Sequence, residues 1–214
     1  MNIQKTSDVT SRTIFGLVYG ESGRGKTFAA STFSTPTLII SAESGVLSLK
    51  DFDIDYVEVK TWSEFRSVIA DLMKNDHPYE NIYIDSLTEI SKLMRDELGG
   101  DDMGFKEWGK YSSQMERFLR AMRSNGKYNV WMTALAKESD DQNLKGADIY
   151  GKIAYNLFQY FDFVFSIHVK EDGARVFLTR EFKGYFGKVR GSDLADAEPA
   201  NFAAITQKIK KGQT

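Results

Sequence analysis

Residues 20–27, with the sequence GESGRGKT, carry the side chains and glycines that can hold a nucleotide phosphate. They fit the pattern Gly-x-x-x-x-Gly-Lys-Thr, with Gly20, Gly25, Lys26 and Thr27 at the fixed positions. Glycines let successive backbone N–H groups turn toward one anion, while the lysine reaches the β and γ phosphates and the threonine hydroxyl ligates magnesium. The predicted nucleotide-binding residues are Gly20, Glu21, Ser22, Gly23, Arg24, Gly25, Lys26, Thr27 and Phe28.

A loop that binds phosphate in this way lies between a buried strand and a helix that points its positive end at the anion. An apolar run leads into the loop at residues 13–19, and a helical pattern leads out of it over residues 26–33. Both flanking segments therefore favour a phosphate-binding loop. A glycine-rich turn that fits the pattern by chance would need neither a strand before it nor a helix after it.

A second apolar run, residues 81–84, ends at Asp85. Phosphate-loop enzymes place an aspartate at the end of a neighbouring strand, where it holds magnesium, and open α/β sheets bind ligands at the carboxyl ends of their strands. We therefore predict that Asp85 joins Thr27 in the magnesium shell. The alternative is that Asp85 or Ser86 only caps the helix that begins near Leu87.

Hydrolysis also requires a group that positions water and accepts its proton. The residue after Asp85 is Ser86, so the glutamate that many ATPases carry at this point is absent. Glu43, which follows the apolar run 37–41, is the preferred candidate for the base. Glu89, about one helical turn beyond Asp85, is the weaker competitor.

The combination of GESGRGKT, the segment IISAESG that contains Glu43, and IYIDS around Asp85 resembles the RecA-like ATPases. Within them it is most similar to small bacteriophage-encoded P-loop ATPases that include RecA-like single-strand annealing proteins of the Sak group. The resemblance implies ATP and Mg²⁺ as ligands, Lys26 on the phosphates, Thr27 and Asp85 at magnesium and Glu43 as the base. It also implies a role in DNA recombination or annealing on single-stranded DNA, as a ring or filament and beside a single-strand-binding protein.

By the same resemblance, the strand 130–135 would sense the γ-phosphate. The family usually has a glutamine or histidine near its end, where this chain has Leu135, and Thr133, Lys137 or Glu138 are the available substitutes. Residues 136–150 would form a DNA-binding loop, although the acidic residues in this stretch oppose phosphate binding.

Lys188 and Arg190, in the segment GKVRG, resemble the two basic residues that RecA-like subunits place against the nucleotide of a neighbour. Such a cation stabilises charge on the transferred phosphoryl group. They complete the predicted catalytic set of Glu43, Lys26, Lys188 and Arg190. A basic hairpin edge that discourages aggregation is an equal alternative for the pair.

The elements that must position these residues follow from the hydrophobic pattern. Near-continuous apolar runs at 13–19, 37–41, 81–84 and 129–135 predict strands covered on both faces, and helical patterns lie between them at 26–33, 63–74, 87–98 and 105–123. Strands that alternate with helices predict an α/β fold with a mainly parallel sheet flanked by helices. The resemblance implies that this fold is a RecA-like P-loop NTPase. The runs 162–169 and 174–179, separated by KEDG, predict a C-terminal antiparallel hairpin.

The composition limits the function classes. A chain of 214 residues with 42% hydrophobic content fits one domain over residues 1–214, with flexible tails at 1–11 and 207–214. The absence of cysteine excludes disulfides and thiolate zinc sites. No apolar run approaches membrane-spanning length, which favours a cytoplasmic protein. With 28 basic and 30 acidic residues, any contact with DNA must be local.

Two other function classes remain open. Small-molecule or nucleotide kinases share the phosphate loop, but they usually carry an arginine-rich lid, which this sequence lacks, and Glu43 fits an ATPase base better. A nucleotide-binding assembly or regulatory protein with little turnover is the third hypothesis, and it is favoured by Leu135 at the sensing position.

Overall fold

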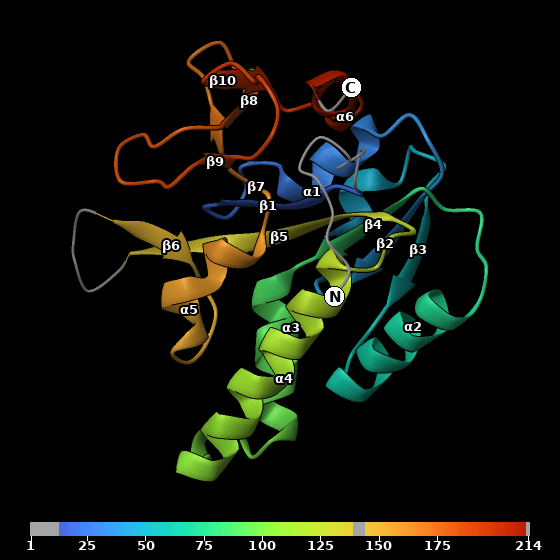
Figure 1. Cartoon of the computed structure of the whole chain (residues 1–214). Helices are drawn as coiled ribbons and strands as arrows, with labels where there is room; N and C mark the ends of the chain where they lie inside the picture. Colours follow the sequence, from blue (N-terminus) through green and yellow to red (C-terminus); the bar gives the residue numbers. More distant parts are fainter. Residues whose placement is uncertain (1–12, 139–143, 213–214) are drawn as a thin grey trace, which may run out of the picture.

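The structure is a computed structural model that describes residues 13–138 and 144–212. Its centre is a mixed sheet in the order β10-β8-β7-β1-β5-β4-β2-β3 (Figure 1). Six of these strands run parallel to one another in the order β7-β1-β5-β4-β2-β3. They are β1 Phe15–Gly20, β2 Thr37–Ser41, β3 Asp55–Glu58, β4 Asn81–Asp85, β5 Asn129–Glu138 and β7 Phe163–Val169.

Antiparallel strands extend the sheet beside β7 and β5. β7 pairs with β8, Arg175–Leu178, which confirms the hairpin expected near the C-terminus. β8 pairs in turn with β10, Ala197–Pro199, and β7 also pairs with the short β9, Lys188–Val189. β6, Lys145–Ala147, folds back on the end of β5.

Helices cover both faces of the sheet (Figure 1). One face packs against α2 Trp62–Lys74, α3 Leu87–Glu97, α4 Phe105–Arg123 and α5 Ile153–Asn156. The other packs against α1 Lys26–Ala29 and α6 Phe202–Gly212. Short 3₁₀ turns occur at η2 Ala30–Thr32, η3 Ser44–Leu49, η4 Gly100–Asp102 and η5 Leu157–Tyr160. The α/β fold with a mostly parallel sheet is therefore confirmed.

The apolar stripe of α4 packs into the core as its spacing predicts. Tyr111, Met115 and Leu119 recur every four residues and are fully buried, because positions four apart share one face of a helix. The neighbouring α3 begins at a polar cap, where Ser86 Oγ accepts a hydrogen bond from the Glu89 N–H at 3.3 Å. Ser86, and not Asp85, is therefore the residue that caps this helix.

Three elements differ from the sequence expectations. β3 has no apolar run because its side chains are mostly exposed at the edge of the described sheet. The predicted helix 26–33 is one α-helical turn followed by η2. Residues 207–212, expected within a flexible tail, instead form the end of α6, where Ile209 is fully buried and Lys208 Nζ lies 2.5 Å from Glu198 Oε2.

The remaining tail expectations, residues 1–11 and 213–214, lie outside the described residues. Over the part of the chain that the structure describes, no helix combines the length and apolarity needed to cross a membrane.

Candidate nucleotide-binding site

The loop of residues 20–27 connects the end of β1 to the start of α1, as its sequence context requires. Every residue of β1 is buried, so the strand fixes the start of the loop in the core. Gly23 and Gly25 have φ angles of 75° and 91°. Side chains rarely adopt this left-handed region, so the two glycines are required by the curvature of the loop.

Lys26 lies beneath the loop with 7% of its surface exposed. Its Nζ donates to the carbonyl oxygens of Gly20 and Glu21, each at 2.9 Å, and its own carbonyl accepts from the Tyr83 hydroxyl at 2.6 Å. Burial lowers the pKa of Lys26, and the nearby charges of Glu43, Asp85 and Glu21 oppose that shift. An ammonium held inside the curve of the loop suits a phosphate oxygen as a further partner.

Thr27, on α1, and Asp85, at the end of β4, meet at the carboxyl edge of the sheet. The strand that leads into the loop, β1, is not adjacent to β4. β5 lies between β1 and β4, which corrects the expectation that Asp85 ends a strand beside that of the loop. Thr27 Oγ1 donates to Asp85 Oδ2 at 2.6 Å, and Thr133 on β5 donates to Asp85 Oδ1. β5 therefore supplies a hydroxyl, that of Thr133, which orients the Asp85 carboxylate toward Thr27.

Glu43 follows β2 at the same edge and accepts a hydrogen bond from Ser86 Oγ. Burial raises the pKa of Glu43, the charges of Asp85 and Glu89 raise it further, and the Ser86 hydrogen bond and Lys26 lower it. A carboxylate with a raised pKa is a stronger base. Glu89 instead forms an ion pair with Lys92 at 2.6 Å.

The residues at this edge fit a magnesium ion held together with nucleotide phosphates. Mg²⁺ in such sites needs only one or two protein oxygen ligands, because phosphates and water supply the rest. Thr27 Oγ1 and the Asp85 carboxylate offer these oxygens. A Cβ at Gly45 would lie 3.1 Å from Thr27 Oγ1, so the glycine keeps space open there. The described residues contain no cluster of three or more His, Asp or Glu that could hold an ion by itself.

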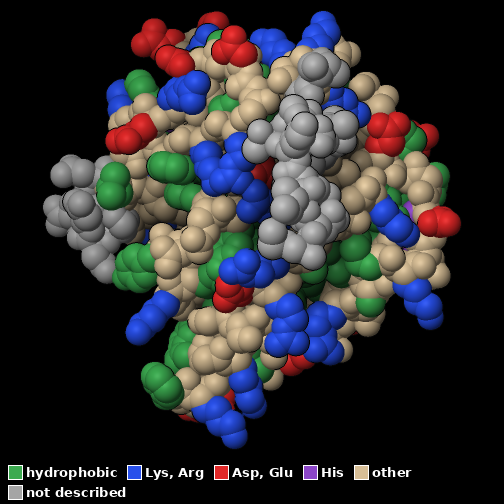
Figure 2. Space-filling model, viewed as in Figure 1, with side chains coloured by type: hydrophobic (Ala, Val, Ile, Leu, Met, Phe, Trp, Pro, Cys, Tyr) green, Lys and Arg blue, Asp and Glu red, His purple; other side chains and the backbone are tan. Residues whose placement is uncertain are grey.

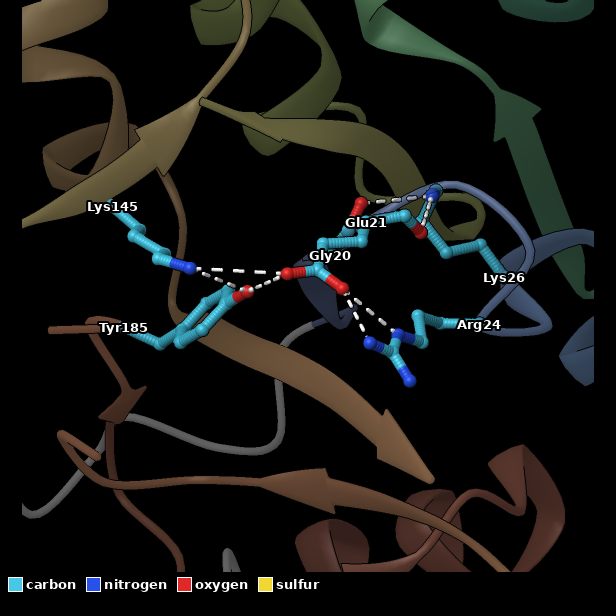
Figure 3. A network of polar contacts seen from close by, with 6 residues as sticks. All are labelled: Gly20, Glu21, Arg24, Lys26, Lys145 and Tyr185. Atoms are coloured by element: carbon cyan, nitrogen blue, oxygen red, sulfur yellow. Dashed lines mark hydrogen bonds and ion pairs between the residues drawn. The ribbon is translucent and has the colours of Figure 1, made fainter. Parts of the chain in front are cut away.

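Glu21 links the phosphate loop to the C-terminal part of the chain (Figure 3). Its carboxylate lies 2.5 Å from Arg24 Nη2 and 3.8 Å from Lys145 Nζ, and it accepts from the Tyr185 hydroxyl at 3.3 Å. Lys145 belongs to β6, and Tyr185 lies in the segment before β9. No sequence pattern predicts the contacts of Glu21 with Lys145 and Tyr185, because these residues are more than 120 positions from it. Residues 21–24 are all exposed, but the Glu21 and Arg24 side chains are paired with each other, and Glu21 also contacts Lys145 and Tyr185.

The expected γ-phosphate sensor and DNA-binding loop lie on β5 and beyond it. The Leu135 N–H donates to Thr88 Oγ1 at 2.9 Å, which anchors the end of the strand on α3. Residues 136–150, expected as a loop, contain the end of β5 and all of β6, while residues 139–143 lie outside the described residues. Lys137 Nζ lies 3.6 Å from Asp148 Oδ1 across this hairpin.

The structure does not bring Lys188 and Arg190 to the loop of their own chain. Val189 pairs with Phe163 at the start of β7, which is level with Gly16, whereas the phosphate loop follows the opposite end of β1. Lys188 Nζ donates to the carbonyls of Phe158 in η5, at 3.0 Å, and of Phe161 just after it, at 2.7 Å. Arg190 Nη1 donates to Asp162 Oδ1 at 2.7 Å.

Comparison with known proteins identifies the family of the chain. A family model described as an AAA domain matches residues 12–191, which include the phosphate loop, Glu43, Asp85 and the β7–β8 hairpin. No curated protein matches the chain. The match covers most of the 214 residues. The chain therefore belongs to the AAA domain family of P-loop ATPases.

Proposed function

We propose that this protein binds ATP with Mg²⁺ and hydrolyses it to ADP and phosphate. The observation that carries the proposal is the hydrogen bond between Thr27 and Asp85, because it joins the phosphate loop to the aspartate at the end of β4. Glu43 follows β2, the strand that pairs with β4, and lies at the same edge. The set therefore contains phosphate-binding, metal-binding and base groups together.

In the proposed reaction, Lys26 holds the β and γ phosphates and stabilises the charge that develops on them. Glu43 accepts a proton from a water molecule whose oxygen attacks the γ phosphorus. The bond between that phosphorus and the oxygen bridging to the β phosphate then breaks, and ADP leaves. Mg²⁺ bound through Thr27 and Asp85 would neutralise charge on the phosphate oxygens.

We further propose, from the resemblance in the sequence, that the ATPase acts in the cytoplasm on single-stranded DNA in recombination or annealing, as a homo-oligomer and beside a single-strand-binding protein. Local positive charge supports the proposed binding of single-stranded DNA. The outer surface of α4 exposes Lys106, Lys110 and Arg117, and Figure 2 shows Lys and Arg side chains over the lower part of the molecule, where α4 lies. Basic residues that contact DNA phosphates supply most of its sequence-independent affinity.

We propose that Lys188 and Arg190 serve the nucleotide of a neighbouring subunit. Their place at the opposite edge from their own loop supports action between subunits, and Arg190 keeps about half of its side chain exposed (51%). In this arrangement Lys188 and Arg190 would exchange their contacts within their own chain for phosphate oxygens of the neighbour's nucleotide.

One experiment tests the proposal as a whole. ATP hydrolysis is measured with and without single-stranded DNA, and the size of the protein is measured by light scattering in the same samples. Turnover that rises with DNA in an oligomer supports the proposal. Transfer of phosphate to a small molecule would identify a kinase instead, and binding without turnover would identify a regulatory or assembly protein.

A further inference from the structure

Arg175 lies at the same edge of the sheet as the phosphate loop. It is the first residue of β8 and pairs with Val169 at the end of β7. β7 runs parallel to β1, so both strands end at this edge. The Arg175 carbonyl accepts a hydrogen bond from the Ala200 N–H at 3.0 Å. The backbone that carries the guanidinium is therefore held in the sheet from two sides.

The Arg175 side chain crosses the phosphate loop. A Cβ at Gly25 would lie only 2.3 Å from Arg175 Nε and 2.7 Å from its Cδ, so the arginine stem is packed directly on the loop backbone. The guanidinium carbon lies 5.2 Å from the centre of the Phe28 ring, a distance at which a cation and an aromatic face attract each other. Gly25 is thus required by its φ angle, and the Arg175 side chain occupies the space that a Cβ would take there.

The guanidinium of Arg175 has no partner carboxylate or carbonyl among the described residues. The two cations of the loop itself, Arg24 and Lys26, do have such partners. Arg24 is paired with Glu21, and Lys26 donates to two loop carbonyls. A guanidinium carries five N–H donors in a planar fork that matches phosphate oxygens. Arg175 therefore brings unused donors to the loop at Gly25.

We infer that Arg175 binds the α and β phosphates of the nucleotide held by its own chain. The inference rests on the proposed function. In a loop of this pattern the backbone N–H groups cradle the α and β phosphates, while the lysine reaches toward the γ phosphate. A guanidinium packed on Gly25 lies beside that part of the cradle. Arg175 would act within the chain, unlike Lys188 and Arg190, which lie at the opposite edge of the sheet.

The test compares nucleotide affinities of the full-length chain by titration calorimetry with ADP and with ATP in the presence of Mg²⁺. Arg175→Met keeps an unbranched stem over Gly25 but removes the charge, and Arg175→Lys restores a cation without the fork. Arg180→Met is the matched control, because Arg180 follows the same strand but pairs with Asp196 at 3.6 Å. Thermal unfolding without nucleotide checks that each variant is folded.

We expect Arg175→Met to weaken ADP and ATP binding equally, by about 10- to 100-fold, the loss typical of hydrogen bonds to charged groups. Arg175→Lys should recover part of this affinity, and Arg180→Met should bind like the wild type. Unchanged affinity in Arg175→Met would overturn this inference alone, as would a loss confined to ATP, which would indicate a γ-phosphate contact. Wild-type protein that bound neither nucleotide would overturn the proposed function as well.

Discussion

Thr27 and Asp85 lie 58 positions apart in the sequence and are joined by a 2.6 Å hydrogen bond from Oγ1 to Oδ2. The bond connects the start of α1 with the end of β4 across the intervening β5. Because Thr133 on β5 donates to the other carboxylate oxygen, the aspartate is held from both sides. The proposed metal site is therefore assembled from α1, β4 and β5 and not from two neighbouring strands alone.

The first prediction concerns this aspartate. Asp85→Asn should raise the Mg²⁺ concentration needed for half-maximal ATP hydrolysis, because a neutral amide is a weaker ligand for a hard cation than a carboxylate. Thr133→Val should produce a smaller shift in the same direction, since it removes only the hydroxyl that orients Asp85. The measurement is turnover against Mg²⁺ concentration. An unchanged Mg²⁺ dependence in Asp85→Asn would remove Asp85 from the site.

The second prediction concerns phosphate binding. Lys26→Ala should weaken ATP binding by more than about 100-fold, because it removes at least two hydrogen bonds to charged groups that each contribute roughly 1.5–3 kcal/mol. Calorimetry with ATP and Mg²⁺ measures the effect. Lys74→Ala is the control, since Lys74 is exposed on α2, away from the loop. If Lys26→Ala kept the wild-type affinity, the phosphate-loop assignment would be wrong.

The third prediction separates the two candidate bases. Glu43→Gln should retain ATP affinity and slow hydrolysis by about 10²- to 10⁴-fold, the usual contribution of a general base. Glu89→Gln should keep most of the turnover, because the Glu89 carboxylate is paired with Lys92. Single-turnover assays with bound ATP measure the chemical step directly. The reverse ranking of the two variants would transfer the role of base to Glu89.

The fourth prediction concerns pH. The hydrogen bond from Ser86 lowers the pKa of Glu43 against the effect of burial. Ser86→Ala should therefore raise the pKa of Glu43. Since a base acts only when it is deprotonated, the acid limb of the kcat/KM profile should move to a higher pH than in the wild type. Ser86→Thr keeps the hydroxyl and should retain the wild-type profile.

The pH profile distinguishes this effect from a loss of stability. Ser86 also caps α3, so Ser86→Ala should cost about 1 kcal/mol of unfolding free energy. That cost changes the amount of folded protein but does not move the acid limb. An acid limb at the wild-type position in Ser86→Ala would show that Ser86 does not tune the base.

The fifth prediction concerns the C-terminal helix. Ile209→Ala should reduce the free energy of unfolding by about 2–5 kcal/mol, as removal of a buried aliphatic side chain typically does, because Ile209 is fully buried under the sheet. Lys210→Ala, at the next and exposed position, should have little effect. Urea denaturation measures both. Equal stability of the two variants would support a flexible tail in place of α6.

Much of the fold could be predicted because its signals are local. Unbroken apolar runs mark strands that are covered on both faces, and β1, β2, β4 and β5 were all found from them. The stripe on α4 gave the bounds of that helix. β3 and β6 gave no such signal, since short edge or hairpin strands bury few side chains. The sequence pattern does not predict α6, because polar residues outnumber the three buried ones, Phe202, Ile205 and Ile209.

The residues that could bind phosphate, ligate magnesium and accept a proton are identifiable from the amino-acid sequence, because residue type, glycine spacing and position after an apolar strand are local properties. The contacts that hold these groups come from the folded arrangement. The order of the strands brings Thr133 into hydrogen-bond contact with Asp85 and Ser86 into hydrogen-bond contact with Glu43, and it packs Arg175 against Gly25. Such contacts depend on which distant segments become neighbours in the sheet, and a linear pattern does not specify those neighbours.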